Sequence, residues 1–338
     1  MATMKDVARL AGVSTATVSR AIMTPEKVSP ATRSRVEAAV TESGYTPHIQ
    51  MSRSLKRSES KTIVAIVPDI SDMYFADLIR GVEETAHANG YLLLVGDSHS
   101  QDYREETFVN MAYRKQADGL ILLGTDLPFG ISKAEQRFLP PLVMACEYSH
   151  ELDLPTVHID NLTAAFEAVN YLTRLGHQRI AQISGPIQSN LCQFRNQGYL
   201  QAIRRSGVEL DESLTVYTEF SLDGGKQAAH SLMTRSKPPT AIFCHSDSIA
   251  IGALHEVKRL GFRVPDDVSI IGFDDIDMVQ YTEPPLTTIS QPRYEIGRQA
   301  MLKLLEILRG KPNSTQSRSC LLETELIVRE STDVCRKR

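Results

Sequence analysis

The first residues of the chain place apolar side chains at the spacing of a short amphipathic helix. Four of them recur at positions i, i+3, i+4 and i+7, which lie on one helical face. This stripe consists of Met4, Val7, Ala8 and Ala11. Thr3 with Asp6 three residues later predicts a capping box at the helix start. Gly12 predicts a sharp turn after it, because glycine adopts positive φ without steric cost.

A second short helix is predicted directly after this turn. Ser14 is its expected N-cap, and Val18 and Ile22 are the positions that it should bury. The opposite face is small and polar, whereas a helix facing only water usually carries Glu and Lys. That face consists of Thr15, Ala16, Ser19 and Arg20. The pattern predicts a helix-turn-helix whose second helix enters the DNA major groove, where an Arg can reach guanine, with an ordinary helical hairpin as the alternative.

A third helix completes a small head, and a basic connector follows it. Ser29 and Pro30 predict an N-cap and a first helical residue. The connector is largely polar and basic, and among its few apolar residues Met51 and Leu55 stand isolated, a pattern typical of a flexible linker. On DNA such a segment can order, with an apolar side chain wedged into a minor-groove step. We therefore assign residues 1–48 to a DNA-binding head and 49–61 to a linker.

From residue 62 onward, apolar runs typical of buried strands alternate with amphipathic helices. The first series has strands at 63–67, 92–95, 119–123, 142–145 and 157–159, with helices at 74–88 and 102–115. The second has strands at 179–183, 214–217, 240–243 and 268–272, with helices at 161–174, 191–206, 223–234 and 246–259. This alternation predicts right-handed βαβ units, and hence an α/β core of two similar lobes with doubly wound parallel sheets.

Three late elements are expected to return the chain through both lobes. They are strand 286–289, helix 293–308 and strand 321–328. The predicted N-subdomain of the core therefore combines residues 62–160 and 291–320, and the C-subdomain combines residues 161–290 and 321–331. The tail 332–338 is expected to fray.

Composition and charge are those of a globular protein with a basic head. Of 338 residues, 42% are apolar and 23% charged, and the net charge is −4. Residues 1–61 contribute +5 and the remainder −9, which fits a polyanion-binding module attached to a different body. Five scattered cysteines without a C-x-x-C pair argue for reduced thiols and against a zinc site. With no secretory signal and no membrane-spanning run, we expect a cytoplasmic protein.

An enzyme is the main alternative to a DNA-binding regulator. The chain lacks G-x-x-x-x-G-K-[ST], G-x-G-x-x-G, G-x-S-x-G and H-E-x-x-H. His158 and Asp160 share one face of a predicted strand and would make an acid–base pair, but a half-buried strand end is the simpler interpretation. A nucleoside-metabolising enzyme is therefore a poor second hypothesis, and no cofactor is expected. The head and the missing signal exclude a periplasmic transport component.

The chain resembles the LacI/GalR family of bacterial repressors over essentially its whole length. The stretches that carry the resemblance are Asp6–Arg20, Pro238–Cys244, Val268–Asp275 and Pro284–Ile289. The resemblance implies a head that binds operator DNA, two periplasmic-binding-protein-like lobes that close on a small ligand, and a homodimer.

Further stretches resemble the cytidine-responsive branch of this family. They are Leu154–Phe166, Phe243–Asp247 and Ser290–Arg298. This resemblance implies that cytidine induces genes for nucleoside uptake and catabolism, and that the cyclic-AMP receptor protein is a partner on DNA. A purine- or sugar-responsive regulator of the same family is the alternative.

The family resemblance also assigns the DNA-binding residues. Thr15, Ala16 and Arg20 match base-reading positions of the family. The positions that match its phosphate contacts are Ser14, Thr17, Ser29 and Thr32. Leu55 matches the leucine that enters the central minor groove. The segment from Pro47 to Leu55 is one residue longer than in the purine repressor, which implies looser coupling between head and core.

A second set of residues matches the family's effector pocket. These candidate ligand-binding residues are Tyr74, Phe75, Asp160, Arg195, Phe220, Ser246 and Asp274. Cys146 stands where several relatives carry an acid. The chemistry suits a nucleoside, whose flat face can stack on aromatic rings while its polar edges meet Asp274 and Arg195. Asp274 also follows an apolar strand, at the end where open α/β sheets bind ligands.

Overall fold

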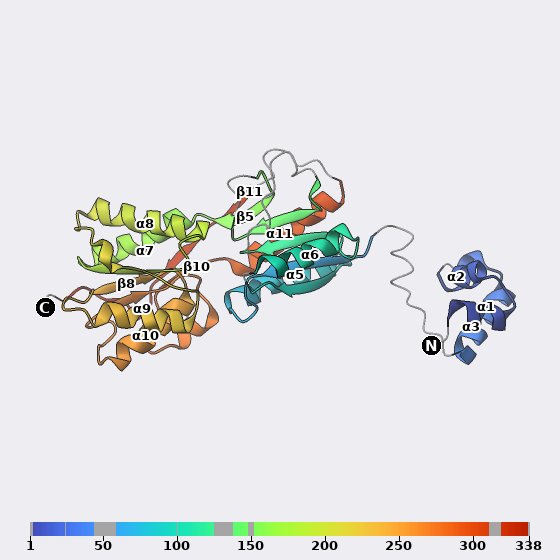
Figure 1. The fold of residues 1–338 in the computed structure, drawn as a ribbon, viewed down its shortest axis with the longest axis horizontal. Coiled ribbons are helices and arrows are strands. Elements are labelled where there is room, and N and C mark those ends of the chain that lie inside the picture. The colour runs from blue at the N-terminus through green and yellow to red at the C-terminus, as the bar shows by residue number, and fades with distance from the viewer. Residues whose placement is uncertain are drawn as a thin grey trace. The chain divides into compact units, whose positions relative to one another are not determined.

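The computed structural model describes residues 3–23, 25–43, 59–99, 101–124, 138–147, 152–310 and 319–336. Leu55, the predicted minor-groove residue, and most of the predicted linker lie outside these ranges. The chain forms two compact units, a helical head and an α/β core that begins at Thr62, and each is described by itself (Figure 1).

The head is a small helical unit with its own apolar core. Its elements are α1 (Met4–Ala11), α2 (Thr15–Met23), the short 3₁₀ helix η1 (Pro25–Lys27) and α3 (Pro30–Ser43). The side chains buried between them are Val7, Ala8, Ala11, Val18, Ala21, Val36 and Ala39. The Asp6 carboxylate accepts a hydrogen bond from the Thr3 N–H at 2.9 Å, and Gly12 has φ 62°. The predicted helices and turn are thus confirmed, although Ile22 is only half-buried.

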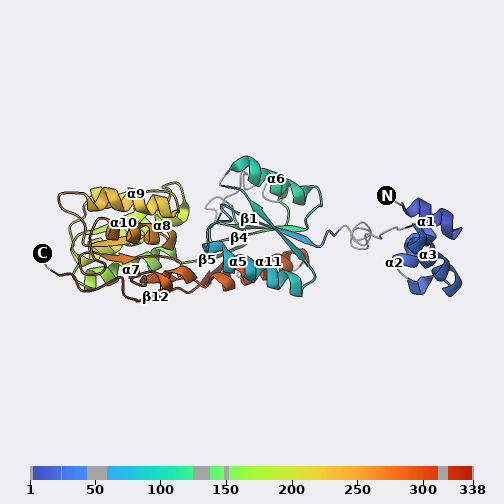
Figure 2. The ribbon, with the colours of Figure 1, turned by 90° about the horizontal axis from the view of Figure 1, so that it is seen from below.

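Six parallel strands form the sheet of the N-subdomain, in the order β11-β5-β4-β3-β1-β2. The strands are β1 (Thr62–Val67), β2 (Leu92–Asp97), β3 (Gly119–Leu123), β4 (Leu142–Ala145), β5 (Thr156–Ile159) and β11 (Ser319–Leu322). Figure 2 shows α6 (Asp102–Tyr113) on one face of this sheet, and α5 (Tyr74–Ala88) with α11 (Arg293–Leu308) on the other. Helix α6 ends two residues before the predicted 102–115.

Helices α5 and α11 cross with their backbones almost in contact. A Cβ on Gly81 would lie 2.1 Å from the Tyr294 carbonyl oxygen, and a Cβ on Gly297 would lie 2.0 Å from the Leu78 carbonyl oxygen. No real side chain tolerates such distances, so only glycine lets the two helices approach this closely. The crossing holds together two helices whose first residues contribute to the site described below.

Four parallel strands form the sheet of the C-subdomain, in the order β7-β6-β8-β9. They are β6 (Ile180–Ser184), β7 (Thr215–Tyr217), β8 (Ala241–Cys244) and β9 (Ser269–Ile271). The pair α7 (Asn161–Arg174) and α8 (Asn190–Ser206) lies on one side of the sheet, and the pair α9 (Leu222–Met233) and α10 (Asp247–Arg259) on the other (Figure 1). Two short 3₁₀ helices, η3 (Glu212–Leu214) and η4 (Asp277–Tyr281), complete it. The predicted doubly wound α/β class is confirmed.

The late elements return the chain through both subdomains, as the sequence predicts. Strand β10 (Thr288–Ser290) leads into α11, and β11 is followed by β12 (Glu325–Ile327), which pairs antiparallel with β10. The prediction of one strand over 321–328 is wrong, because β11 ends in the six-stranded sheet and β12 begins beside β10. The chain crosses between the subdomains at the two residues that separate these strands.

Strand β2 lies at the edge of its sheet and is less buried than the apolar run 92–95 predicts. Leu92, Leu94 and Val95 are 61%, 39% and 37% exposed. An edge strand has a neighbouring strand on one side only, so its apolar side chains are less covered than those of the central strands. The expectation of a buried strand is therefore wrong for these three residues.

The tail that was expected to fray is packed as far as Arg336, where the described residues end. The Asp333 N–H donates to Ser269 Oγ at 3.2 Å, and the Cys335 N–H donates to the Leu175 carbonyl at 2.8 Å. His177 Nε2 lies 3.1 Å from the Asp333 carbonyl oxygen. These contacts satisfy backbone groups of the tail, which explains why it stays against the C-subdomain. Among the helices of the described ranges, none has both the length and the apolar character needed to cross a bilayer.

Candidate functional site

The head presents the predicted base-reading residues on the outer face of α2. Thr15, Ala16 and Arg20 are exposed and Ser19 is half-buried, whereas Val18 on the inner face is fully buried. The helix is therefore anchored through its apolar side and offers short polar side chains and one arginine outward. A helix of this kind can approach base edges closely in the major groove. The individual base contacts stay predictions.

The predicted phosphate-contacting residues form two matching helix caps. Ser14 Oγ accepts a hydrogen bond from Thr17 N at 3.1 Å and lies 2.9 Å from Thr17 Oγ1. Ser29 Oγ accepts one from Thr32 N at 3.4 Å and lies 2.9 Å from Thr32 Oγ1. The two pairs mark the N-termini of α2 and α3, whose N–H groups and positive dipole ends attract phosphate. The two caps are thus suitably placed for the contacts with DNA phosphates that were predicted for their residues.

In the core, a buried hydrogen-bonded chain joins Tyr74, Gln291 and Asp274. Tyr74 Oη donates to Gln291 Oε1 at 3.1 Å, and Gln291 Nε2 donates to Asp274 Oδ1 at 2.7 Å. Tyr74 Oη also lies 3.2 Å from Cys146 Sγ. Because the Gln291 oxygen accepts from the tyrosine, its NH₂ group faces the carboxylate, and the orientation of the amide is defined.

Burial governs the protonation of the residues in this hydrogen-bonded chain and of Cys146 beside it. It raises the pKa of the Asp274 carboxyl well above its usual range, and the nearby Arg195 guanidinium opposes the shift only in part. Burial also raises the pKa of Tyr74 and that of the Cys146 thiol, the latter to about 12. Tyr74 and Cys146 are therefore neutral at pH 7, and Asp274 holds a proton more readily than a surface carboxyl does.

Arg195 is buried and held from three directions. Its Nε donates to Asn161 Oδ1 at 2.8 Å, and its Nη1 donates to the His245 carbonyl. The guanidinium carbon lies 3.7 Å from the centroid of the Phe273 ring, a cation–π contact. Burial lowers the pKa of His245 well below its usual value, so this neighbour is neutral. Arg195 is therefore not a surface arginine of α8, and its guanidinium is fixed in place.

The predicted aromatic residues pack in two different places. Tyr74 and Phe75 make an edge-to-face contact with ring centroids 5.1 Å apart and planes at 80°. Phe220 is half-buried and lies against Gly185 at the end of β6, where a Cβ would come within 2.3 Å of its ring. Phe75 therefore belongs with the Tyr74 chain, and Phe220 covers the end of a C-subdomain strand.

Asp160 and Ser246 act as helix caps in this structure. The exposed Asp160 accepts hydrogen bonds from Thr163 N at 3.0 Å and Thr163 Oγ1 at 2.7 Å at the start of α7. Ser246 Oγ is buried and accepts from Ile249 N at 3.1 Å at the start of α10. Both positions follow strand ends, where ligand contacts were predicted, but a structural role accounts for them without a ligand. Their ligand contacts stay predictions.

The hypothetical acid–base pair of His158 and Asp160 is not supported. His158 Nε2 lies 2.9 Å from Ser319 Oγ and its Nδ1 lies 3.1 Å from the Ile159 carbonyl oxygen, while Asp160 is engaged by α7. Within the described ranges, no group of three or more His, Cys, Asp and Glu side chains could hold a metal ion. The simpler interpretation of a strand end therefore holds for His158.

Sequence reasoning missed three polar residues that the structure brings into this region: Asn161, Gln291 and Glu147. Glu147 is buried, and its Oε1 accepts from Ser189 Oγ at 2.9 Å and from Leu191 N at 3.4 Å near the start of α8. At Cys146, where the family resemblance implies an acid in several relatives, the structure has a buried acid one residue later, Glu147. The signal was its position two residues after the end of the apolar strand β4. Gln291 lies inside the stretch Ser290–Arg298 but carries no chemical signature of its own.

Comparison with known proteins places this geometry in a family. Residues 3–48 match "Bacterial regulatory proteins, lacI family", and residues 169–332 match "Periplasmic binding protein-like domain". The HTH-type transcriptional repressor CytR of Escherichia coli K12 is 56% identical over 331 residues, which cover 98% of this chain and 96% of CytR. The chain belongs to the LacI family of bacterial regulatory proteins.

Other LacI-family proteins match over nearly the same length. The ribose operon repressor of Haemophilus influenzae is 37% identical over 331 residues, 98% of each chain. The lac repressor dimer bound to operator and the anti-inducer ONPF superposes with a TM-score of 0.79 at 25% identity, covering 98% of this chain and 99% of that one. This LacI-family chain is accordingly a DNA-binding transcriptional repressor and not an enzyme.

Proposed function

We propose that this LacI-family repressor senses a nucleoside, with cytidine as the inducing effector, at the cluster of Tyr74, Arg195, Asp274 and Gln291. The observation that carries the proposal is the buried Tyr74–Gln291–Asp274 chain. A carboxyl group with one oxygen held by Gln291 keeps acceptor sites for ribose hydroxyls or an exocyclic amine. The 56% identity to CytR adds support.

In the proposed mechanism, ligand occupancy in the core controls the head. Two heads of a homodimer bind the half-sites of a palindromic operator and repress genes for nucleoside uptake and catabolism. Cytidine binds the DNA-free conformation better, by about 1–3 kcal/mol, and so induces those genes. The repressor acts in the cytoplasm, needs no cofactor, and has the cyclic-AMP receptor protein as a partner on DNA.

The edge strand β2 supports the homodimer. Its Leu92, Leu94 and Val95 expose apolar surface at the open edge of the six-stranded sheet, and a second copy of the chain would cover it. The lac repressor, similar in fold, is described as a dimer. Sedimentation of wild type and of Leu94→Glu tests this: a monomeric variant is expected, and a variant as dimeric as wild type would place the interface elsewhere.

Calorimetric titration of the purified repressor with cytidine, adenosine, hypoxanthine and ribose tests the effector. We expect cytidine to bind most tightly, and to lower the affinity for operator DNA measured by fluorescence anisotropy. Asp274→Asn should bind cytidine weakly and keep its operator affinity. Preferred binding of another probe, or none, would contradict the cytidine assignment.

A sugar-responsive repressor is the second candidate. It is supported by the 37% identity to the ribose operon repressor, and by the same Asp274 and Gln291 pair, since hydroxyl-rich sugars also offer donors to a carboxyl group. The ribose titration separates the two candidates. Ribose binding as tight as that of cytidine would favour the sugar over the base as the recognised part.

A further inference from the structure

The candidate effector acid lies on a turn whose backbone is strained. Asp274 and Asp275 have φ 122° and 57°, in the left-handed region that residues with a side chain rarely adopt. We call Asp274–Ile276 the Asp274 turn. Such a conformation persists only where the surroundings hold it in place. The groups that hold this turn therefore decide where the Asp274 carboxyl points.

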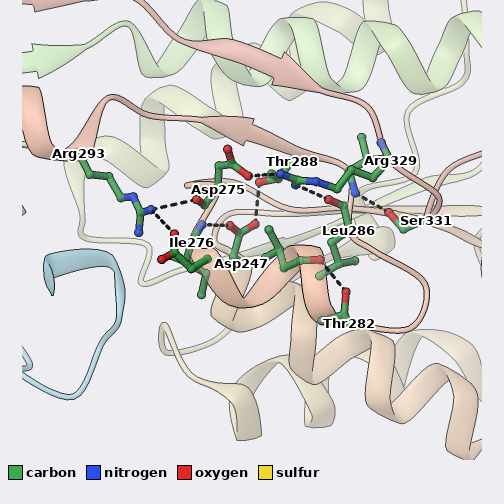
Figure 3. Close-up of polar contacts among 12 residues, drawn as sticks. Asp247, Asp275, Ile276, Thr282, Leu286, Thr288, Arg293, Arg329 and Ser331 are labelled. Carbon is green, nitrogen blue, oxygen red and sulfur yellow. Dashed lines mark hydrogen bonds and ion pairs between the residues drawn. The ribbon is translucent and has the colours of Figure 1, made fainter. Parts of the chain in front are cut away.

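Two arginines from distant parts of the chain hold the middle residue of the Asp274 turn. Arg329 Nη2 donates to Asp275 Oδ1 at 2.7 Å, while its Nη1 donates to the Leu286 carbonyl at 2.8 Å. Arg293 Nη2 donates to the Asp275 carbonyl at 3.0 Å. Figure 3 shows Asp275 between these two guanidinium groups. One arginine fixes the side chain of Asp275 and the other fixes its backbone.

The last residue of the turn is held by a buried acid. The Ile276 N–H donates to Asp247 Oδ2 at 2.9 Å, and Asp247 Oδ1 accepts from Thr288 Oγ1 at 2.7 Å (Figure 3). Asp247 begins α10 and Thr288 begins β10, so this end of the turn is fastened to the C-subdomain.

Arg293 also connects the Asp274 turn to helix α5. The same Nη2 lies 2.9 Å from Asp77 Oδ2 on α5 and 3.5 Å from Asp277 Oδ1 after the turn. The Arg293 side chain is 9% exposed and that of Asp77 29%, so water screens this ion pair less than a fully exposed one. Asp77 lies one turn after Tyr74 on α5. Arg293 therefore joins the Asp274 turn directly to the helix that carries the aromatic pair.

We propose that Arg293 and Arg329 are positioning residues for the effector response, which rests on the proposed role of Asp274. Arg329 sets the direction of the Asp274 carboxyl by fixing Asp275, and so governs effector affinity. Arg293 transmits occupancy of the site from the turn to α5, and so governs how strongly the effector changes operator binding. Neither residue needs to touch the ligand for these effects.

The test measures two quantities on the full chain, with cytidine as the probe. One is the Kd for cytidine by calorimetry, and the other is the ratio of operator Kd values with and without saturating cytidine. Arg293→Gln should leave the cytidine Kd within about threefold of wild type while the ratio falls by about fivefold or more. Arg298→Gln is the matched control on the same helix, because Arg298 pairs within α11 with Glu295 at 2.7 Å. It should change neither quantity.

Arg329→Gln should weaken cytidine binding roughly tenfold, because it leaves the Asp275 carboxylate without its guanidinium partner. Combining it with Asp275→Asn should add little further loss, since both changes break the same ion pair. Arg329→Lys keeps the charge and should recover part of the affinity, which a merely structural loss of packing would not predict.

Distinct outcomes overturn each part of the proposal. The coupling role of Arg293 is overturned if Arg293→Gln and Arg298→Gln show the same ratio of operator Kd values with and without cytidine. The positioning role of Arg329 is overturned if the losses of cytidine affinity in Arg329→Gln and Asp275→Asn add up in the double variant. If Arg293→Gln does not fold, Asp77→Asn breaks the same ion pair from α5 and should lower the ratio likewise. A wild type that responds to none of the four probes defeats the proposed function and this inference together. If wild type responds, Asp274→Asn does not, and Arg293→Gln behaves as wild type, only this inference fails.

Discussion

Asparagine in place of Asp247 would remove an ionisable group from the C-subdomain core while keeping its contacts. Asp247 is fully buried, and its two oxygens accept from Ile276 N and Thr288 Oγ1. An asparagine can still accept from the Ile276 N–H with its oxygen, while its NH₂ group donates to the Thr288 hydroxyl. The substitution therefore isolates the effect of the charge.

The pKa of Asp247 sets the size and the sign of this effect. Burial raises it from 3.8 to about 7, so the folded state binds the proton more tightly than the unfolded chain does. Below the ordinary pKa both states are protonated and the carboxyl does not destabilise the fold. As the pH rises toward 7 the unfolded chain ionises first, and the free energy of unfolding falls by about 4 kcal/mol in all, of which about 2–3 kcal/mol lies between pH 5 and 8.

Urea unfolding of wild type and Asp247→Asn at pH 5 and pH 8, followed by circular dichroism, measures this difference. The free energy of unfolding of wild type relative to the variant should fall by about 2–3 kcal/mol between the two pH values. Asp211→Asn is the control, because a hydrogen bond from Ser213 lowers the pKa of Asp211. Its contribution is complete above its ordinary pKa and should be equal at pH 5 and pH 8. A wild-type-to-Asp247→Asn difference that is the same at both pH values would refute the raised pKa.

Three further predictions concern the predicted reading helix, the proposed effector acid and a helix crossing. Arg20→Ala should reduce discrimination between operator and random DNA by about 1–3 kcal/mol in competition anisotropy, with cytidine binding intact. Unchanged selectivity would rule Arg20 out as a base reader. Asp274→Ala should abolish the cytidine response while operator affinity persists, and a normal response would show that the pocket lies elsewhere. Gly297→Ala places a Cβ 2.0 Å from the Leu78 carbonyl oxygen and should cost about 1–3 kcal/mol of stability. Its Tm should drop while that of Gln299→Ala on the same helix does not, and equal Tm values would contradict the close crossing.

Most of the fold could be predicted because its signals are local. The head is predicted by caps, a turn glycine and apolar spacing, all within about one helical turn of each other. The alternation of strands and helices in the core is predicted by equally local apolar patterns. Whether an apolar run is central or at an edge depends on sheet order. The run at 92–95 carries the same kind of residues as a buried strand, yet among the described strands β2 pairs with β1 alone.

The two other errors have the same origin in long-range pairing. Nothing in residues 321–328 distinguishes the end of β11 from the start of β12, because the two strands differ in their partners and not in their own pattern. The tail is held by Leu175, His177 and Ser269, which are far away in the sequence. No local pattern predicts such contacts.

The candidate site was predictable where chemistry and strand ends coincide. Asp274 follows an apolar strand and is an acid, so sequence reasoning finds it. Gln291 and Asn161 are ordinary polar residues whose importance arises only from their contacts with Asp274 and Arg195. The helical pattern of α8 alone would have placed Arg195 on the surface, and only the family resemblance indicated otherwise.

The late return of the chain to the N-subdomain has a consequence for newly made protein. A ribosome delivers about 5–20 residues per second from the N-terminus, and the apolar core described for the head is formed by residues between Val7 and Ala39. The six-stranded sheet, in contrast, is incomplete until α11 and β11 emerge, and the proposed effector cluster needs Asp274 and Gln291. During that interval a nascent chain carries a folded head without an assembled sensor. The proposed sensor is thus completed later than the head in each new molecule.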